Sequence, residues 1–115
     1  MNLSKYQDFV ESRAKGHAAD LKYVAIALGG ETGEALDVVK KMLRLVDGNK
    51  VKDWPDLIEW ANTDGDRNKL DDLREKLMLE LGDVLWYWVR MCQLFGMNPK
   101  DVMKANKVKL EARND

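Results

Sequence analysis

An apolar stripe in the second half of the chain most constrains what this sequence can fold into. Between residues 70 and 95 an apolar side chain recurs at every third or fourth position, which is the spacing of one face of an α-helix. The stripe and a second apolar strip beside it comprise Leu70, Leu73, Leu77, Leu81, Val84, Trp88, Met91 and Phe95, then Met78, Leu85, Val89 and Cys92. A helix that is apolar around so much of its girth must be buried on more than one side. We therefore expect it to pack against other helices in a bundle.

The rest of the chain carries the marks of helices as well. Ser4 followed by Gln7 forms a capping box, and Gly16 can end the helix that begins there. Asn98 is a good N-cap, and Pro99 follows it in the first helical position, which proline favours. Two prolines and few β-branched runs leave little room for strands. We predict an all-α, four-helix bundle. Its helices are expected over residues 4–16, from between Ala18 and Asp20 to about Val46, over residues 70–95, and from Asn98 to about Arg113.

Residues 47–68 interrupt the helical pattern. This segment is polar, ends in the turn-like "NTDGDRN" and offers one short helical turn at "DLIEW". A connection of this length is uncommon in a small domain unless it has a function or is mobile. We predict one domain over residues 1–115, large enough for its own core, with residues 47–68 as an irregular connection.

Composition excludes several classes of function. The formal net charge is -1, so no basic excess suggests nucleic acid as a partner. Cys92 and His17 are the single cysteine and histidine, which excludes a disulfide framework, a cysteine-based zinc site and a di-iron bundle with two Glu-x-x-His pairs. Cys92 is predicted to be a small buried hydrophobic residue. The chain has no apolar leader and no run of about 18 apolar residues, so we expect a cytoplasmic protein without a membrane span.

Two carboxylates stand in the most apolar part of the long predicted helix. Glu80 and Asp83 are the only acidic residues between residues 77 and 95, and at i and i+3 they share a face beside the core stripe. Tyr87 continues that face one turn later. Burying an ionised carboxylate without a partner is costly, and two neighbouring carboxylates also repel each other. A cation between them removes that penalty, and salt bridges to basic residues elsewhere are the alternative.

A matching pair of carboxylates lies in the glycine-rich segment "ALGGETGEALD". Glu31 and Glu34 are also i and i+3, so an antiparallel second helix places them opposite Glu80 and Asp83. Four converging carboxylates suit a hard cation such as Mg²⁺ or Mn²⁺. Lys41 returns to nearly the same face, whereas Asp37 lies at a poorer angle and is kept outside the site.

The glycines of this segment and a polar row near the C-terminus complete the pattern. We expect Gly29, Gly30 and Gly33 to lie inside a helix and to leave room for a neighbouring helix, a metal or a phosphate. A phosphate-cradling glycine loop is excluded, because "GGETG" lacks the Gly-Lys-Ser/Thr ending and follows no strand. The polar row, which suits phosphate oxygens but is also typical of a solvated helix face, is Asn106, Lys109 and Arg113.

Taken together, these motifs resemble the MazG-like family of all-α nucleoside triphosphate pyrophosphohydrolases. That family carries Glu-x-x-Glu on one helix, Glu-x-x-Asp on the next, and a downstream Asn-x-x-Lys-Leu-x-x-Arg. Here they correspond to "GGETGEALDVVKK", "ELGDVLWYWVRM" and "NKVKLEAR", in the same order. Tyr6-Gln7 is similar to the family's opening, so the resemblance spans nearly the whole chain. The exception is the segment of residues 47–68, which is longer and more polar than the linker expected for the family.

The resemblance implies a reaction and roles for individual residues. Glu31, Glu34, Glu80 and Asp83 would bind Mg²⁺, or Mn²⁺, and the metal would activate a water that attacks the α-phosphorus of a (d)NTP and releases pyrophosphate and (d)NMP. Glu34 is either a metal ligand or a base for that water. The implied phosphate-neutralising residues are Lys109, Arg113 and Lys41, and the implied hydrogen-bonding residues are Asn106 and Tyr87.

The resemblance also implies a homodimer or a dimer of dimers, associated through apolar helix faces. The excess apolar surface of the long helix agrees with this independently. Stacking on the nucleobase and plain packing are both open for the aromatic residues, namely His17, Tyr23, Trp54, Trp60 and Trp86. A non-catalytic helical module that binds nucleotides or proteins is the alternative function.

Overall fold

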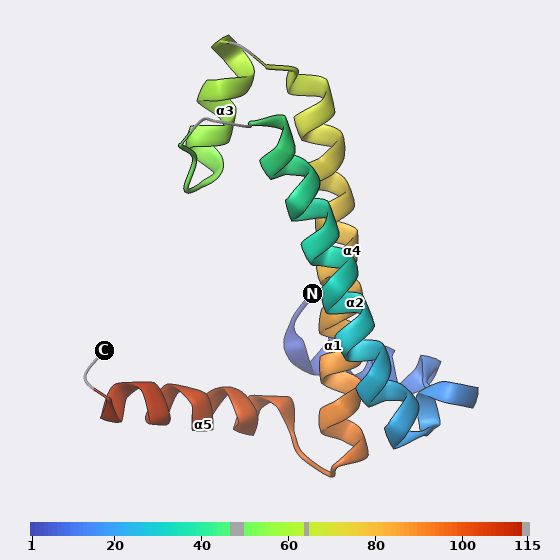
Figure 1. The fold of residues 1–115 in the computed structure, drawn as a ribbon. Coiled ribbons are helices and arrows are strands. Elements are labelled where there is room, and N and C mark those ends of the chain that lie inside the picture. The colour runs from blue at the N-terminus through green and yellow to red at the C-terminus, as the bar shows by residue number, and fades with distance from the viewer. Residues whose placement is uncertain (47–49, 64, 114–115) are drawn as a thin grey trace. The chain divides into compact units, whose positions relative to one another are not determined.

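The computed structural model describes residues 1–46, 50–63 and 65–113, and within these residues it contains helices and no strands (Figure 1). The all-α prediction is therefore confirmed. The elements in chain order are α1 (Leu3–Arg13), the 3₁₀ helix η1 (Gly16–Ala19), α2 (Leu21–Leu45), α3 (Trp54–Thr63), α4 (Arg67–Leu94) and α5 (Pro99–Ala112). The described residues thus form five α-helices, one more than the sequence predicted. None of these helices is long and apolar enough to span a membrane.

The additional helix, α3, corrects the prediction for residues 47–68. Trp54–Thr63 form a ten-residue helix where the sequence predicted an irregular connection with a single turn. The helix is capped by Asp53, whose carboxylate accepts a hydrogen bond from the backbone N–H of Asp56 at 3.1 Å. One side of α3 packs into a hydrophobic core, and that burial stabilises a helix whose local sequence signal is weak. Residues 47–49 and 64 of the predicted connection lie outside the described residues.

The chain divides into two compact units, each described here by itself. Unit 1 consists of Met1–Gly29 and Leu85–Asp115, and unit 2 consists of Gly30–Val84. The boundaries therefore fall inside α2 and inside α4. The organisation of residues 1–115 as one domain stays a prediction.

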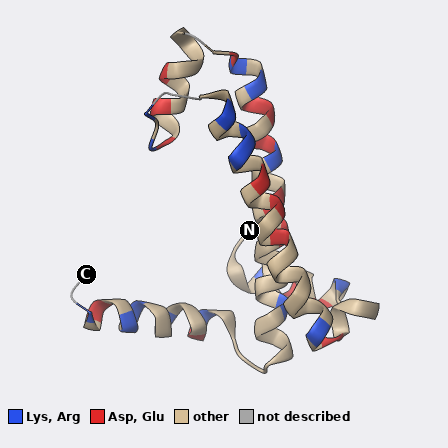
Figure 2. Cartoon of the chain, viewed as in Figure 1, with Lys and Arg blue, Asp and Glu red and all other residues tan. Residues whose placement is uncertain are grey.

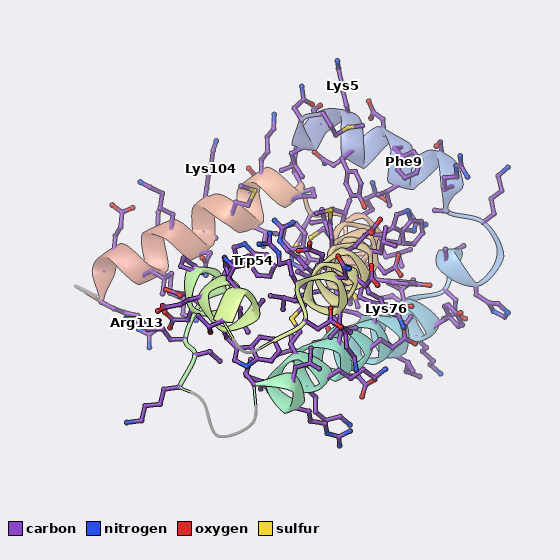
Figure 3. All side chains as sticks on the ribbon, turned by 90° about the horizontal axis from the view of Figure 1, so that it is seen from above. Lys5, Phe9, Trp54, Lys76, Lys104 and Arg113 are labelled. Atoms are coloured by element: carbon purple, nitrogen blue, oxygen red, sulfur yellow. The ribbon has the colours of Figure 1, made fainter. Side chains whose placement is uncertain are left out.

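Unit 2 is built from the second half of α2, all of α3 and the first part of α4. The α2 and α4 segments run antiparallel, and α3 packs against both (Figure 1). Arg74 on α4 places its guanidinium 4.9 Å from the ring centroid of Trp54, a cation–π contact beside the core. Trp54 is labelled in Figure 3. The core comprises Val38, Met42, Ala61 and Leu70, with Trp54, Leu57, Trp60, Leu73 and Leu77 partly buried against it.

The turn after α3 gives a first testable prediction. A Cβ at Gly65 would come within 2.6 Å of the Trp60 ring, so Gly65→Ala must displace a ring that packs against the core. We expect a loss of about 1–3 kcal/mol in unfolding free energy and a Tm lower by roughly 5–15 °C, measured by circular dichroism. The control is Gly29→Ala, because a Cβ at Gly29 meets nothing within 4 Å and alanine favours the helix. Equal Tm values for Gly65→Ala and the wild type would contradict the packing argument.

Unit 1 is held together by a small apolar core and by hydrogen bonds from α4 to the N-terminal segments. Arg90 donates to the carbonyl oxygen of Ala18 at 2.7 Å, and Gln93 donates to that of Gln7 at 2.9 Å. The fully or almost fully buried residues of this unit are Val10, Val24, Val89, Cys92 and Pro99. Cys92 is thus buried as predicted, and that burial raises the pKa of its thiol.

The helix ends follow the sequence signals except at the two ends of α1. That helix ends at Arg13 and not at the predicted Gly16, which instead begins η1. The cap of α1 is Asn2, whose side chain accepts from the backbone N–H of Lys5 at 2.9 Å, so the predicted capping box at Ser4 is wrong by two residues. Asp20 accepts from the N–H groups of the first turn of α2, and Asn98 caps α5 as predicted. Gly96, after α4, has a φ of 67°, which favours glycine at a helix end.

Part of the apolar surface of the long helix α4 stays uncovered in the single chain. Leu81, assigned to the core stripe by its spacing, is 52% exposed, and its neighbour Leu79 is 67% exposed. On the α2 segment of the same unit, Leu36 is 62% exposed. Association into homo-oligomers through such faces stays a prediction.

Candidate metal centre

The glycine-rich segment lies inside α2, which runs unbroken from Leu21 to Leu45. The prediction that these glycines belong to a helix interior is confirmed. A Cβ added at Gly29, Gly30 or Gly33 would meet nothing within 4 Å, so no neighbouring helix of the described chain approaches there. The space beside these glycines is open, and room for a metal or a phosphate is the remaining part of the hypothesis.

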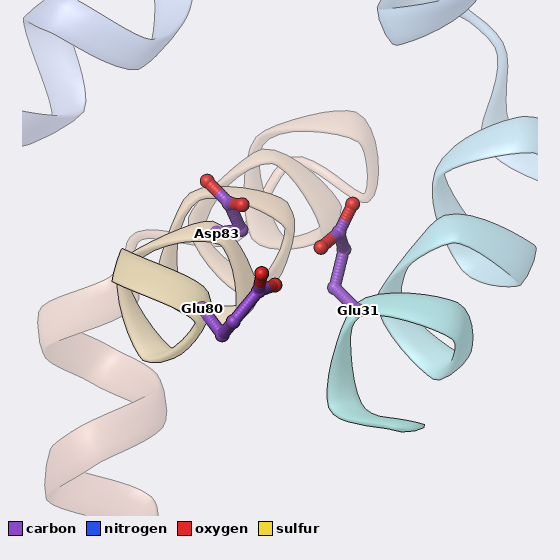
Figure 4. Close-up of side chains that lie close together, drawn as sticks. All are labelled: Glu31, Glu80 and Asp83. Atoms are coloured by element: carbon purple, nitrogen blue, oxygen red, sulfur yellow. The ribbon is translucent and has the colours of Figure 1, made fainter. Parts of the chain in front are cut away.

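Three carboxylates come together between the α2 and α4 segments of unit 2. Glu31 from α2 and Glu80 and Asp83 from α4 each offer an oxygen, and these oxygens lie within 4.8 Å of one another. Figure 4 shows the three side chains gathered between the two helices. The i, i+3 spacing places Glu80 and Asp83 on one face of α4, and the antiparallel α2 segment brings Glu31 opposite them. Three carboxylate oxygens at this spacing could hold a metal ion, and metal binding by these residues stays a prediction.

The electrostatics of this cluster are unfavourable when no cation is bound. Glu31 Oε2 and Glu80 Oε2 are shielded from solvent and have no hydrogen-bond partner within the described chain. Burial, together with Glu34 and the negative charges of Asp83 and Glu80, raises the pKa of Glu31. Burial also raises the pKa of Glu80, with Glu34 and Asp83 adding to the effect. Shielded, unpartnered carboxylate oxygens and mutual repulsion are the conditions that a hard divalent cation relieves.

Glu34 lies beside this group and is more exposed than Glu31. Its carboxyl group contributes to the raised pKa values of both Glu31 and Glu80. Glu34 and Glu80 also line an open pocket of about 400 Å³. Glu34 is thus in contact with both the carboxylate cluster and the adjoining space, and its role as ligand or base stays a prediction.

Basic side chains border the same pocket. Lys41 from α2 lines it and pairs with Asp37 at 3.3 Å. Its binding of phosphate stays a prediction. Hydrogen bonds from Lys40 and Lys41 lower the pKa of Asp37, which lies apart from the three-carboxylate group. Lys76 from α4 lines the pocket as well, and sequence reasoning missed it. Its spacing four residues before Glu80 was a usable signal, because residues i and i+4 share a helix face.

The other predicted substrate residues belong to unit 1. Tyr87 follows Asp83 by one turn on α4 and has an edge-on contact with Trp86, with ring centroids 5.2 Å apart. The predicted polar row is exposed, with Asn106 and Lys109 on α5 and Arg113 as its C-cap residue. Their predicted contacts with phosphate and sugar remain predictions.

The aromatic candidates for base recognition are divided between the units. In unit 1, His17 and Tyr23 stack on each other with ring centroids 4.7 Å apart. In unit 2, Trp60 packs against the core, and Trp54 lines an apolar pocket of about 470 Å³. The Trp60 side chain thus packs against the core. For the other aromatic candidates, stacking on a nucleobase stays a prediction.

Comparison with known proteins decides the family. The sequence pattern of the MazG nucleotide pyrophosphohydrolase domain matches residues 20–115, which include all four acidic candidates and the polar row of α5. The chain belongs to the MazG family. The resemblance inferred from the motifs is therefore confirmed, and the family is one of nucleotide pyrophosphohydrolases.

A relative of this MazG chain is the gene 37 protein of Mycobacterium phage L5. The two are 34% identical over 95 residues, which cover 83% of this chain and 67% of the phage protein. No solved structure matches the chain significantly.

Proposed function

We propose that this MazG protein is a Mg²⁺-dependent nucleoside triphosphate pyrophosphohydrolase that converts a (d)NTP into (d)NMP and pyrophosphate. The observation that carries the proposal is the meeting of Glu31, Glu80 and Asp83, with two shielded oxygens that lack partners. A salt-bridge network, the main structural alternative, is not supported, because the ion pairs among the described residues do not involve these three carboxylates.

The residues that would hold the cation are Glu31, Glu80 and Asp83, with Glu34 as a fourth ligand or as a base. All are carboxylates, whose oxygen atoms are ligands better suited to hard cations such as Mg²⁺ and Mn²⁺ than to softer metals. When bound, the cation neutralises phosphate charge and lowers the pKa of a bound water.

The chain's own residues then orient the substrate and accept a proton. Glu34 is exposed to the pocket and lies close to the cluster, so it is placed to accept the proton of the attacking water. The water oxygen forms a bond to the α-phosphorus while the bond to the bridging oxygen breaks, and pyrophosphate leaves. Cationic side chains stabilise the charge that shifts onto the leaving group, and we assign this role to Lys41, Lys109 and Arg113. Asn106 and Tyr87 are proposed to hydrogen-bond phosphate or sugar.

We also propose that the active form is a homodimer or a dimer of dimers. The uncovered apolar side chains on α2 and α4 in unit 2, such as Leu36 and Leu79, support association through helix faces. A non-catalytic helical module that binds nucleotides or proteins without hydrolysing them is the second candidate, and the presence of every acidic residue of the family pattern argues against it.

The products of hydrolysis test the proposed function directly. The purified protein, incubated with each (d)NTP and Mg²⁺, is expected to release nucleoside monophosphate and pyrophosphate, detected by anion-exchange chromatography. In water enriched in ¹⁸O the label should enter the monophosphate, because the attack is at the α-phosphorus. Nucleoside diphosphate and orthophosphate as products would disprove this mechanism. Nucleotide binding without turnover would favour the non-catalytic module.

A further inference from the structure

A second pocket of unit 2 has mostly apolar walls and takes no part in the proposed hydrolysis. Its volume is about 470 Å³, inside the range of roughly 300–1,000 Å³ that is typical of sites for small organic molecules. Residues of α2, α3 and α4 and of the segment directly before α3 line it, and none of those described belongs to the carboxylate cluster. The aliphatic part of its lining consists of Val39, Met42, Leu43, Val51, Leu57 and Leu77.

One wall of this apolar pocket carries a cation. Arg74 and Trp54 both line the pocket, and the guanidinium of Arg74 lies 4.9 Å from the centroid of the Trp54 ring. None of the ion pairs among the described residues involves Arg74. A guanidinium presents a planar fork of N–H donors that matches the two oxygens of a carboxylate. Arg74 is therefore available to the carboxylate of a bound molecule.

The other charged residues of the lining favour an anion over a cation. Lys52 adds a second positive charge, and Asp53 is the acidic member. The Asp53 carboxylate already accepts the capping hydrogen bond of α3 from the backbone N–H of Asp56 at 3.1 Å. Figure 2 shows basic residues on α2 and α4 where these helices lie beside α3, interspersed with acidic ones on α4. The lining itself thus has two cations against one carboxylate that is engaged as a cap.

The walls and the cation together define the occupant. An apolar body gains by removing the aliphatic walls from water. An uncharged occupant would cover the Arg74 guanidinium without supplying a counter-ion, which is costly. That guanidinium also covers one face of the Trp54 ring, so the walls suit an alkyl chain better than a flat aromatic ring. We infer that the pocket binds a medium-chain aliphatic carboxylate, with the chain among the aliphatic walls and the carboxylate on Arg74.

The first test compares ligands that differ only in charge or in chain length. The wild type is titrated calorimetrically with decanoate, decylammonium and octanoate, each below the concentration at which it forms micelles. We expect decanoate to bind about tenfold more tightly than decylammonium, because the cations of the lining attract the anion alone. Octanoate should bind about tenfold more weakly than decanoate, because two fewer methylene groups are buried. Equal affinities for decanoate and decylammonium would overturn the inference.

Charge variants test the role of Arg74. Arg74→Met should weaken decanoate binding about tenfold, because a charge-assisted hydrogen bond is lost, and Arg74→Glu should reverse the preference in favour of decylammonium. The matched control is Arg13→Met, which removes a guanidinium–ring contact of 5.3 Å with Phe9 in unit 1 and should bind decanoate like the wild type. An equal loss in Arg13→Met, or a retained preference for decanoate in Arg74→Glu, contradicts a carboxylate on Arg74.

Protein NMR locates the ligand and distinguishes it from other occupants. Decanoate should shift the indole N–H signal of Trp54 and leave that of Trp86, in unit 1, unchanged. A shift of Trp86 alone would place the ligand elsewhere and overturn the inference. Displacement of decanoate by a (d)NTP without Mg²⁺ would assign the pocket to the nucleotide, and dissociation of a homo-oligomer by decanoate would assign it to a second copy of the chain. Neither result, nor a failure to bind decanoate, bears on hydrolysis at the carboxylate cluster.

Discussion

Glu80→Gln is expected to lower kcat for (d)NTP hydrolysis by roughly 100-fold or more while the protein stays folded. The substitution keeps the shape of the side chain and replaces a charged ligand of the proposed metal with a neutral amide, and losing one electrostatic contact of this kind has effects of that order. The side chain contributes to a group of three carboxylates whose oxygens lie within 4.8 Å of one another. Initial rates of pyrophosphate release at saturating Mg²⁺ measure the effect.

The stability of the same variant distinguishes a lost ligand from a damaged fold. Glu80 Oε2 has no hydrogen-bond partner in the described chain, and repulsion from Glu34 and Asp83 is removed when the charge is removed. The metal-free Tm of Glu80→Gln should therefore equal or exceed that of the wild type. Glu75→Gln, which alters an exposed carboxylate on the same helix outside the cluster, should leave both rate and Tm unchanged. A rate within about threefold of the wild type for Glu80→Gln would remove this residue from the site.

The helices that carry the site were predictable because their signals are local. The apolar period of α4 and the Asn98 cap of α5 lie within a few residues of the element that they define. The helix α3 was not predictable in the same way. Its stability comes from Trp54, Leu57 and Trp60 packing on residues distant in sequence, and local propensity carries no information about such contacts.

Helix periodicity was the part of the sequence signal that predicted which side chains meet in the candidate site. The i, i+3 spacing and an antiparallel pairing were sufficient to bring Glu31 to Glu80 and Asp83. Lys76 was overlooked because a lysine among charged residues is typical of a solvated face. Its place in the pocket depends on a wall supplied by the other helix, and only the packed structure contains that wall. The contribution of Tyr87, one turn after Asp83 on α4, stays a prediction. The contribution of the row at Asn106, Lys109 and Arg113 also stays a prediction, because no helical period relates it to the cluster.

Adding Mg²⁺ is expected to raise the Tm of the protein at about pH 7.5 and to have a much smaller effect at about pH 5. A ligand at 100 times its Kd stabilises the folded state by about 2.7 kcal/mol, which corresponds to about 10 °C for a chain of this size. Thermal unfolding with Mg²⁺ and with EDTA measures the shift. The pH dependence follows because protons and the cation compete for the same carboxylates.

Without metal, the acidic cluster is expected to make the folded protein less stable as the pH rises. This is opposite to the effect of Mg²⁺, which stabilises the protein more at the higher pH. Burial raises the pKa of Glu31 and of Glu80, so the folded state retains protons that the unfolded chain releases. That contribution to stability is complete below the ordinary glutamate pKa and is lost as the pH rises through the raised pKa. Asp37 acts in the other direction, since Lys40 and Lys41 lower its pKa and its contribution is lost on acidification. The difference between wild type and Glu80→Gln isolates the cluster, because Asp37 is common to both. A Mg²⁺ shift that survives in Glu80→Gln, or that is equal at both pH values, would contradict metal binding by these carboxylates.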